Sequence, residues 1–490
     1  MERKKKSIAK NYIYNLAYQI LVMILPLITT PYVSRVLGAN NIGIYSYTLS
    51  ITTFFILFGS LGIALYGQRE IAYNQENKEK YSYTFWEILI LRCITMLISI
   101  LIFYFVFAIG KNDYNLYYKI LILELVGNTI DISWFFQGLE EFKKTVIRNT
   151  IVKIISVVLI FTLVKTQNDL SLYFIIYVLS TLIGNLSLWL YLPKYLSKVK
   201  FTEFKIFRHL KPTIALFIPQ IAIQVYTLLD KTMIGTIIAD KSEVGYYEQA
   251  QKVVKMLLTI ITSLGTVMLP RIASTFAEGN KEKVRQYMKN SFNMVFILAF
   301  PLIFGLIAVS DNFVPFFFGN GYEKVSTLMK VISPIILFIG LSNVTGTQYL
   351  LPTKRQKEYT LSVVFGAIVN FIMNSLLIPK YGAIGASIGT VIAEITVTGV
   401  QIYYTRKDFN FMKLIKLSKN YILASIVMFV CCFIVSLAVK SNVASLLVQI
   451  IVGILSYFIV LKIMHDKFLE KMLNKLTAKL RKNRREVKNV

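Results

Sequence analysis

Ionisable side chains recur at helical spacing inside otherwise apolar stretches of this chain. Glu124, Asn128 and Asp131 stand at i, i+4 and i+7, which places them on one face of a continuous helix. Arg92 and Lys153 lie in the neighbouring apolar stretches, at about the same depth from the flanking basic segments as Asp131. Because an ionised group in hydrocarbon is costly, such residues usually face a cavity or a partner. The pattern predicts a buried ion pair or triad, which serves either a functional site or helix pairing alone.

Two further polar stripes share the spacing i, i+4, i+7 and i+11. They consist of Gln220, Gln224, Thr227 and Lys231, and of Gln251, Lys255, Thr259 and Thr262. Such stripes are typical of the wall of a hydrated cavity, although Lys255 could instead extend its ammonium group to the membrane interface. Together with Arg92 and Lys153 they predict a mixed cavity that leans cationic. Arginine binds a phosphate or diphosphate through paired hydrogen bonds, and lysine binds it as a point charge.

The elements that must position these groups are membrane-spanning helices. The chain has 490 residues, of which 55% are hydrophobic, and it still carries a formal net charge of +28. Apolar stretches fill it from end to end, and a helix of about 20 such residues crosses a bilayer. We therefore expect an all-α polytopic membrane protein with about fourteen transmembrane helices. Their expected starts lie near Tyr12, Ile42, Thr84, Leu116, Val146, Leu172, Thr213, Glu248, Ser291, Val325, Tyr359, Gly382, Lys419 and Val443.

The basic residues lie in loops between these spans, and the loops alternate in charge. Residues 194–211 and 271–289 are strongly basic, whereas the loops at Lys111 and Lys165 carry essentially one basic residue each. The positive-inside rule places the strongly basic loops, and with them both termini, in the cytoplasm. This topology requires an even number of spans. It also explains the net charge without a nucleic-acid partner, and we expect none.

Two halves of the chain echo each other in sequence. Gly43, Tyr45 and Arg69 recur 202 positions later as Gly245, Tyr247 and Arg271. Lys119, Gln137 and Lys143 recur 211 positions later as Lys330, Gln348 and Lys354. The repeat predicts two six-helix lobes in the same orientation, related by an axis along the membrane normal, as is common in transporters.

The expected domains follow from the repeat. Residues 1–205 and 206–410 form the two lobes, and residues 411–465 form transmembrane helices 13 and 14. Residues 466–490 carry leucines at helical spacing among lysines and arginines. They predict a basic amphipathic cytoplasmic tail that suits an anionic lipid surface. A solvated charged tail is the alternative.

Several blocks of the sequence together resemble one family of transporters. They are PYVSRVLGANNIGIYSYTLS (31–50), WFFQGLEEFKK (134–144), LLDKTMIG (228–235), VGYYEQAQK (244–252), LPRIAS (269–274) and PKYGAIGASIGTVIAE (379–394). In combination they resemble the polysaccharide transporter family, which comprises the Wzx-type flippases of the multidrug/oligosaccharidyl-lipid/polysaccharide exporter superfamily. The resemblance covers most of the chain to about residue 410.

The resemblance implies a flippase that works by alternating access through a central, cationic cavity. Its substrate would be an undecaprenyl-diphosphate-linked oligosaccharide, a repeat unit of capsule, teichoic acid or another surface polysaccharide, moved from the cytoplasmic to the outer leaflet of the bacterial cell membrane. Other membrane proteins of polysaccharide assembly are its implied partners. The expected substrate-binding residues are Arg35, Arg92, Lys153, Gln220, Gln224, Lys231, Lys255 and Arg271. Candidates for cation binding or ion pairing are Glu124, Asp131, Asp230 and Glu394.

Two other functions fit the same composition. A cation-coupled multidrug exporter of the same superfamily could use Glu124, Asp131 and Glu394 as cation ligands. A membrane-embedded polysaccharide polymerase or glycosyltransferase would need a large loop with acid, base or metal-binding residues, and the loops here are short and basic. The sequence contains no GxxxxGK[ST] loop, no DxD pair and no HExxH helix. We therefore expect a transporter rather than an enzyme, with no metal site and no cofactor.

Overall fold

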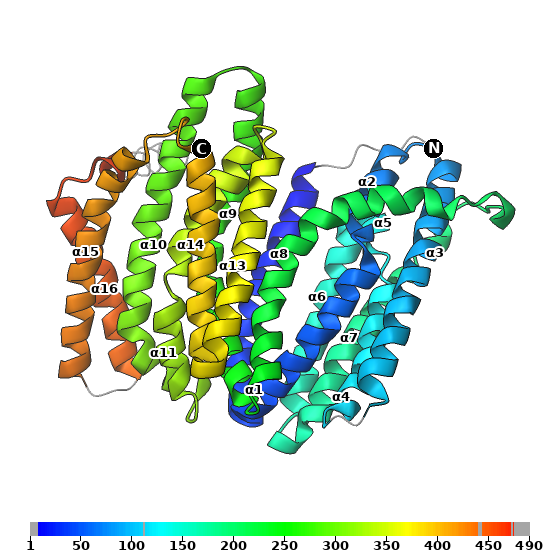
Figure 1. Cartoon of the computed structure of the whole chain (residues 1–490), viewed down its shortest axis with the longest axis horizontal. Coiled ribbons are helices and arrows are strands. Elements are labelled where there is room, and N and C mark those ends of the chain that lie inside the picture. Colours follow the sequence, from blue (N-terminus) through cyan, green and yellow to red (C-terminus); the bar gives the residue numbers. More distant parts are fainter. Residues whose placement is uncertain (1–7, 111–112, 440–442, 472–473, 475–490) are drawn as a thin grey trace, which may run out of the picture. The chain divides into compact units, whose positions relative to one another are not determined.

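The computed structural model of the chain describes residues 8–110, 113–439, 443–471 and 474. Side chains are described there except for residues 8–20, 22–23, 218–220, 222–223, 225–226 and 266–267. Every regular element in the described part of the chain is a helix (Figure 1), which confirms the expected all-α class. Most of the expected 466–490 tail lies outside the described residues, which reach it only at its beginning.

The helices follow the expected spans closely. They are α1 (Ile8–Ser60), α2 (Ile63–Tyr73), α3 (Lys78–Phe103), α4 (Asn115–Thr129), α5 (Ser133–Gly138), α6 (Phe142–Leu163), α7 (Leu170–Trp189), α8 (Leu210–Ile237), α9 (Ser242–Ala277), α10 (Lys281–Phe318), α11 (Glu323–Ile332), α12 (Ile335–Ser342), α13 (Gln356–Tyr381), α14 (Ala383–Thr405), α15 (Phe411–Ala438) and α16 (Val443–Ile463). A π-helical turn, η6 (Asn343–Leu350), continues α12.

The number of membrane spans agrees with the sequence. Twelve segments of the described chain are long and apolar enough to cross a membrane. The first of them contains two spans, because α1 is broken at Gly38, whose φ of 76° and ψ of 167° are accessible mainly to glycine. Helix α8, with 28 residues, adds one more span, which brings the number to fourteen. The expectation of about fourteen transmembrane helices is thereby confirmed.

The described residues fall into two compact units. Unit 1 comprises the residues up to Glu248, and unit 2 comprises those from Gln249 onward. Unit 1 therefore contains α8 and the first turns of α9 in addition to α1–α7. Helix α8 belongs to it because α8 packs along α1, where Ser50 Oγ lies 2.8 Å from Thr232 Oγ1.

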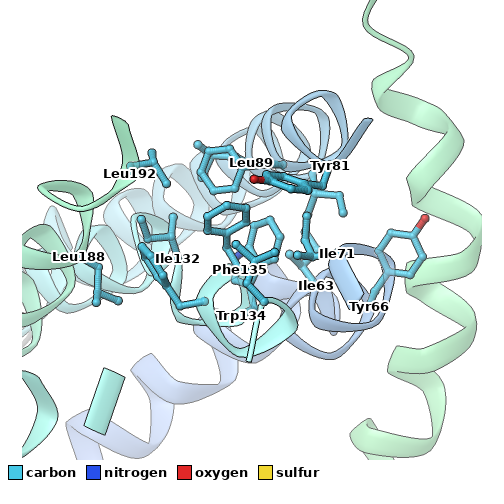
Figure 2. Close-up of a cluster of buried hydrophobic side chains, with 14 of the residues drawn as sticks. Ile63, Tyr66, Ile71, Tyr81, Leu89, Ile132, Trp134, Phe135, Leu188 and Leu192 are labelled. Atoms are coloured by element: carbon cyan, nitrogen blue, oxygen red, sulfur yellow. The ribbon is translucent and has the colours of Figure 1, made fainter. Parts of the chain in front are cut away.

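An aromatic core in unit 1 gathers buried side chains mainly from α2, α3 and α5 (Figure 2). Trp134, Phe135 and Phe136 of the short helix α5 are all buried in it. Helix α2 approaches α5 so closely that a Cβ at Gly67 would lie 2.4 Å from the Trp134 ring. Burial of large aromatic side chains is a major source of stability, so the WFFQG segment anchors α5 beneath α2. The sequence did not reveal α2 as a separate element.

Candidate functional site

The helix of the fourth span is interrupted at the place where the first charged cluster was expected. Helix α4 ends at Thr129 and α5 begins at Ser133, so residues 130–132 form a break. The last carbonyls of a helix have no intrahelical donor, and hydrocarbon offers no water to replace it. A break of this kind therefore requires side chains that donate hydrogen bonds to it.

Arg92 of α3 is the cation that meets this requirement. Its side chain is buried, with 3% of the residue exposed, and it donates to the carbonyl oxygens of Asn128 (2.5 Å) and Asp131 (3.1 Å). The guanidinium thus binds the backbone of Asp131, and the expected ion pair or triad with Lys153 is not formed. Lys153 is half-buried on α6 and has no ion pair among the described residues. The expectation of one shared helical face is also wrong for Asp131, because α4 ends before it.

Helix α7 supplies two more donors to the same break. Asn185 Nδ2 donates to the carbonyl oxygen of Gly127 at 2.8 Å, and Trp189 Nε1 donates to that of Ile130 at 2.9 Å. Neutral amide and indole groups therefore donate to the carbonyl oxygens next to those that the Arg92 guanidinium binds. The fourth span is held as a discontinuous helix by its neighbours on two sides.

A second arginine connects the break to α6 and α7. The Asp131 carboxylate accepts hydrogen bonds from the Ser133 amide (2.9 Å) and hydroxyl (2.5 Å), which starts α5. Arg148 of α6 donates to Ser133 Oγ at 2.9 Å and to Asn185 Oδ1 at 2.7 Å. Arg148 follows two lysines, Lys143 and Lys144, and was not among the expected site residues. Its position just after the expected start of span five, near Val146, was the available signal that it lies inside the helix bundle.

Glu124 is the buried acid of this region, with 5% of the residue exposed. Asn128, one turn further along α4, donates to its Oε1 at 3.1 Å. This pair keeps the helical spacing that the sequence predicted. No ion pair involves Glu124 in the described part of the chain.

A second polar cluster joins α1, α8 and α9 within unit 1. The Tyr247 hydroxyl donates to Asp230 Oδ2 at 2.5 Å. Lys231 Nζ lies 2.9 Å from Glu248 Oε2, which also accepts from Ser46 Oγ at 3.1 Å. The expected site residues Asp230 and Lys231 of α8 therefore both contact side chains of α9. Glu248 was recognised from the sequence only as the start of a span.

The two glycines of the sequence repeat lie against each other in this cluster. A Cβ at Gly43 would lie 1.7 Å from the Lys241 carbonyl oxygen, and a Cβ at Gly245 would lie 2.1 Å from the Ala39 carbonyl oxygen. Ala39 and Lys241 are separated by the same 202 positions as Gly43 and Gly245. Residues Ser46 and Glu248, which are hydrogen-bonded, share this separation. The contact is the same from either side, so a local two-fold axis passes between the glycines.

Lys241 lies beside this glycine contact, at the C-terminal end of α8. Its Nζ donates to the carbonyl oxygens of Gly235 (2.6 Å) and Ile238 (3.0 Å), and it lies 5.2 Å from the centre of the Tyr47 ring. A cation at the C-terminal end of a helix is favoured by the helix dipole. Partial burial lowers the pKa of Lys241 below its usual value, with nearby carboxylates opposing the shift.

A third ionic cluster, which the sequence did not predict, joins the segment before α8 to α3. Glu87 is 1% exposed and accepts hydrogen bonds from Arg208 Nη2 (2.5 Å) and the Lys205 amide (2.6 Å). His209 Nε2 lies 2.8 Å from the same carboxylate, and its Nδ1 lies 2.7 Å from the Tyr66 hydroxyl. Burial lowers the pKa of the His209 imidazole below its ordinary value, although the Glu87 hydrogen bond opposes the shift.

The remaining expected site residues differ in their exposure. In unit 1, Arg35 is exposed near the Gly38 break, and Gln224 is exposed on α8. The side chain of Gln220 lies outside the described ones.

In unit 2, the exposed Lys255 donates to Gln251 Oε1 at 2.9 Å. Arg271 is exposed, with its guanidinium 5.5 Å from the centre of the Tyr287 ring, and Glu394 is buried on α14. The described residues contain no group of three or more His, Cys, Asp or Glu side chains that could hold a metal ion.

Comparisons with known proteins agree with this arrangement of helices. The model of a family described as polysaccharide biosynthesis protein matches residues 8–276, and that of the lipid II flippase MurJ matches residues 145–458. A putative O-antigen transporter of Escherichia coli K12 is 27% identical over 415 residues, which cover 83% of this chain and 99% of that protein. The capsular polysaccharide biosynthesis protein CapF of Staphylococcus aureus is 23% identical over 417 residues, covering 82% of this chain and 100% of CapF.

The fold has a solved relative. The structure of lipid II flippase MurJ in an inward closed conformation matches with a TM-score of 0.75 at 18% identity, covering 94% of this chain and 100% of MurJ. This likeness shows a shared fold. The chain is thus a multi-pass bacterial membrane protein that belongs to the polysaccharide biosynthesis protein family, the Wzx-type transporters of the multidrug/oligosaccharidyl-lipid/polysaccharide exporter superfamily.

Proposed function

We propose that this protein is a flippase that moves an undecaprenyl-diphosphate-linked oligosaccharide from the cytoplasmic to the outer leaflet. The observation that carries the proposal is the match over nearly the whole length of a putative O-antigen transporter. The oligosaccharide would be a repeat unit of capsule, teichoic acid or another surface polysaccharide. Both termini lie in the cytoplasm in this proposal, because the strongly basic loops then obey the positive-inside rule.

The substrate diphosphate requires cations that it can reach. Arg35, Lys255 and Arg271 are exposed, whereas the Arg92 guanidinium is buried and hydrogen-bonded to the α4 carbonyls. We therefore assign diphosphate binding to the exposed cations. Arg92 acts as a positioning residue that shapes the fourth span.

In this proposal the substrate crosses the membrane by alternating access. The mirrored contact of Gly43 with Gly245 joins equivalent helices of the two repeats with no side chain between their backbones. A backbone contact of this kind can be broken and remade without rearranging a packed side-chain core. We propose that it closes one end of the path and opens when the substrate leaves.

Depletion of the protein tests the proposal in cells. We expect undecaprenyl-diphosphate-linked oligosaccharide to accumulate in the cytoplasmic leaflet while surface polymer is lost, and the composition of the trapped sugar would identify the substrate. An unchanged leaflet distribution with intact polymer would refute the proposal. Lost polymer with intermediates in the outer leaflet would point to a polymerase instead.

A cation-coupled multidrug exporter is the second candidate. The buried carboxylates of Glu124 and Glu394 favour it, because a carboxylate enclosed in a helix bundle is a ligand for a coupling cation. Drug susceptibility after deletion separates the two functions. Increased sensitivity to several cationic drugs with normal surface polymer would favour the exporter, and normal sensitivity with lost polymer would favour the flippase.

A further inference from the structure

A cationic pocket in unit 2 lies outside all the clusters described above. It has a volume of about 190 Å³ and lies between α10, the connection from α14 to α15, and the first turns of α15. Helices α10 and α15 pack side by side along this edge (Figure 1). The pocket is lined by Arg285, Lys289, Phe292, Asp408, Phe409, Asn410, Lys413, Leu414 and Leu417.

The charges at the pocket do not cancel. Its single acid, Asp408, lies 2.8 Å from Arg355, a cation that is not part of the lining. Arg285, Lys289 and Lys413 are exposed, and none of them forms an ion pair among the described residues. Three cations therefore face a pocket whose only carboxylate is already paired. An anion bound in the pocket would compensate this excess of positive charge.

The interior of the pocket is apolar. Phe292 and Leu414 are buried in its wall, and the Phe292 ring lies 6.1 Å from that of Phe409 and 6.0 Å from that of Phe411. A free inorganic anion would gain nothing from such a wall. An amphiphile that places its phosphate among the cations and its glycerol and first methylenes against the rings would use both parts.

The first turn of α15 adds to the preference for an anion. Asn410 caps this helix by accepting a hydrogen bond from the Lys413 amide at 3.0 Å. The positive end of the α15 dipole is therefore held at the pocket, where it favours a negative charge. The flanking segments 271–289 and 406–419 belong to the strongly basic loops.

We propose that this pocket binds the phosphate headgroup of an anionic phospholipid from the cytoplasmic leaflet. The proposal depends on the cytoplasmic placement of the basic loops, but it does not depend on which substrate is transported. The bound lipid would hold α15 against α10 at the membrane surface. This site is distinct from the predicted lipid contact of residues 466–490.

Lipid binding to the purified full-length protein tests the site. We would compare retention of phosphatidylglycerol and phosphatidylcholine by native mass spectrometry, using Arg285→Gln/Lys289→Gln/Lys413→Gln as the pocket variant. The matched control is Lys407→Gln/Lys416→Gln/Lys419→Gln, which removes three exposed charges from the same region but none from the lining. We expect phosphatidylglycerol affinity to fall at least about tenfold in the pocket variant and less than about twofold in the control.

The other outcomes overturn the proposal. Equal losses in both variants would mean unspecific attraction to a basic surface, and equal retention of both lipids would mean that charge is not recognised. Displacement of phosphatidylglycerol by equimolar inorganic phosphate or undecaprenyl diphosphate would assign the pocket to another phosphate source.

The variant Arg285→Lys/Lys289→Arg/Lys413→Arg keeps every charge and should keep the affinity for phosphatidylglycerol. Leaflet assays on the pocket variant separate this failure from a failure of the flippase proposal.

Discussion

Span four in unit 1 and span ten in unit 2 are both interrupted, yet they are held together by different chemistry. They correspond in the repeat, since Gln137 and Gln348 are 211 positions apart near their ends. Span four has its break at residues 130–132, whereas span ten passes from α11 to α12 at Ser333 and Pro334 and then becomes the π-helical turn η6. The same place in the repeat thus carries two kinds of irregular helix.

Neutral side chains surround the irregular part of span ten, and Thr398 Oγ1 of α14 donates to the carbonyl oxygen of Phe338 at 2.9 Å. Thr345 donates to Gln401 Oε1 at 2.6 Å, and Gln401 Nε2 donates to Ser362 Oγ at 3.0 Å. Gln348 Nε2 donates to Asn343 Oδ1 at 3.0 Å across η6. In span four the charged Arg92 shares this role with the neutral Asn185 and Trp189.

Two irregular helices can therefore be stabilised by hydrogen bonds of unequal strength. Hydrogen bonds from a charged donor are roughly twice as strong as those between neutral groups. A single substitution should therefore damage unit 1 more than unit 2. The following predictions test this inequality.

The largest effect is expected for Arg92→Met. It removes the two charge-assisted hydrogen bonds that the carbonyl oxygens of Asn128 and Asp131 accept from the guanidinium. We expect a loss of about 3 kcal/mol or more, measured as a large fall in Tm of the detergent-purified protein. Arg92→Lys keeps the charge and should lose less. An unchanged Tm for Arg92→Met would remove the basis of the comparison.

The mirrored glycines should respond equally, because there the two repeats are alike. Gly43→Ala and Gly245→Ala each place a methyl group against a backbone carbonyl. We expect each to lower stability by about 1–3 kcal/mol and to reduce polymer export. Gly399→Ala is the control, since a Cβ at that position meets nothing within 4 Å. A harmful effect of only one of the pair would contradict the two-fold contact.

A smaller effect is expected for Gln401→Leu in unit 2. It removes the neutral partner of Thr345 and Ser362, for a loss of about 1–2 kcal/mol. Chemical denaturation of the same preparations measures it. If this variant were destabilised as strongly as Arg92→Met, charged and neutral braces would be equivalent and our distinction would fail.

The smallest effect concerns pH at the ionic cluster of unit 1. Burial lowers the pKa of folded His209, so as the pH falls through 6.5 the unfolded chain takes up a proton that the folded chain resists. Stability should therefore fall as the pH falls below the ordinary value of 6.5. His209→Gln should flatten this part of the profile of Tm against pH. An identical slope in the variant would show that the histidine contributes nothing.

The sequence predicted the spans well because apolar length is a property of the chain itself. Each expected start except Gly382, which lies between α13 and α14, falls inside a helix. The break after Thr129 was not predicted, because a hydrophobic stretch gives no sign of where backbone hydrogen bonds stop. The expected face of Glu124 and Asp131 failed for this reason.

The candidate site was predictable only in its composition. Residues such as Arg92 and Asp230 were found because ionisable groups in apolar stretches are rare. Their partners could not be found, because Arg92 binds backbone carbonyls, which every residue possesses. Arg148 was missed because it closely follows basic residues of a loop. The contact between Gly43 and Gly245 could be seen only in the structure.

We propose that this chain itself translocates a lipid-linked oligosaccharide and that its two repeats separate as it does so. Ser50 Oγ of α1 lies 2.8 Å from Thr232 Oγ1 of α8, so cysteines there can form a reversible disulfide between the repeats. The natural Cys93, Cys431 and Cys432 are first replaced by serine. Single-cysteine variants control for the substitutions themselves.

The decisive measurement is translocation of undecaprenyl-diphosphate-linked oligosaccharide in proteoliposomes that contain the Ser50→Cys/Thr232→Cys protein. We predict translocation by the reduced protein, arrest after oxidation and recovery after addition of reductant. Equal translocation by the oxidised and reduced forms, or none above empty liposomes by the reduced form, would contradict the account.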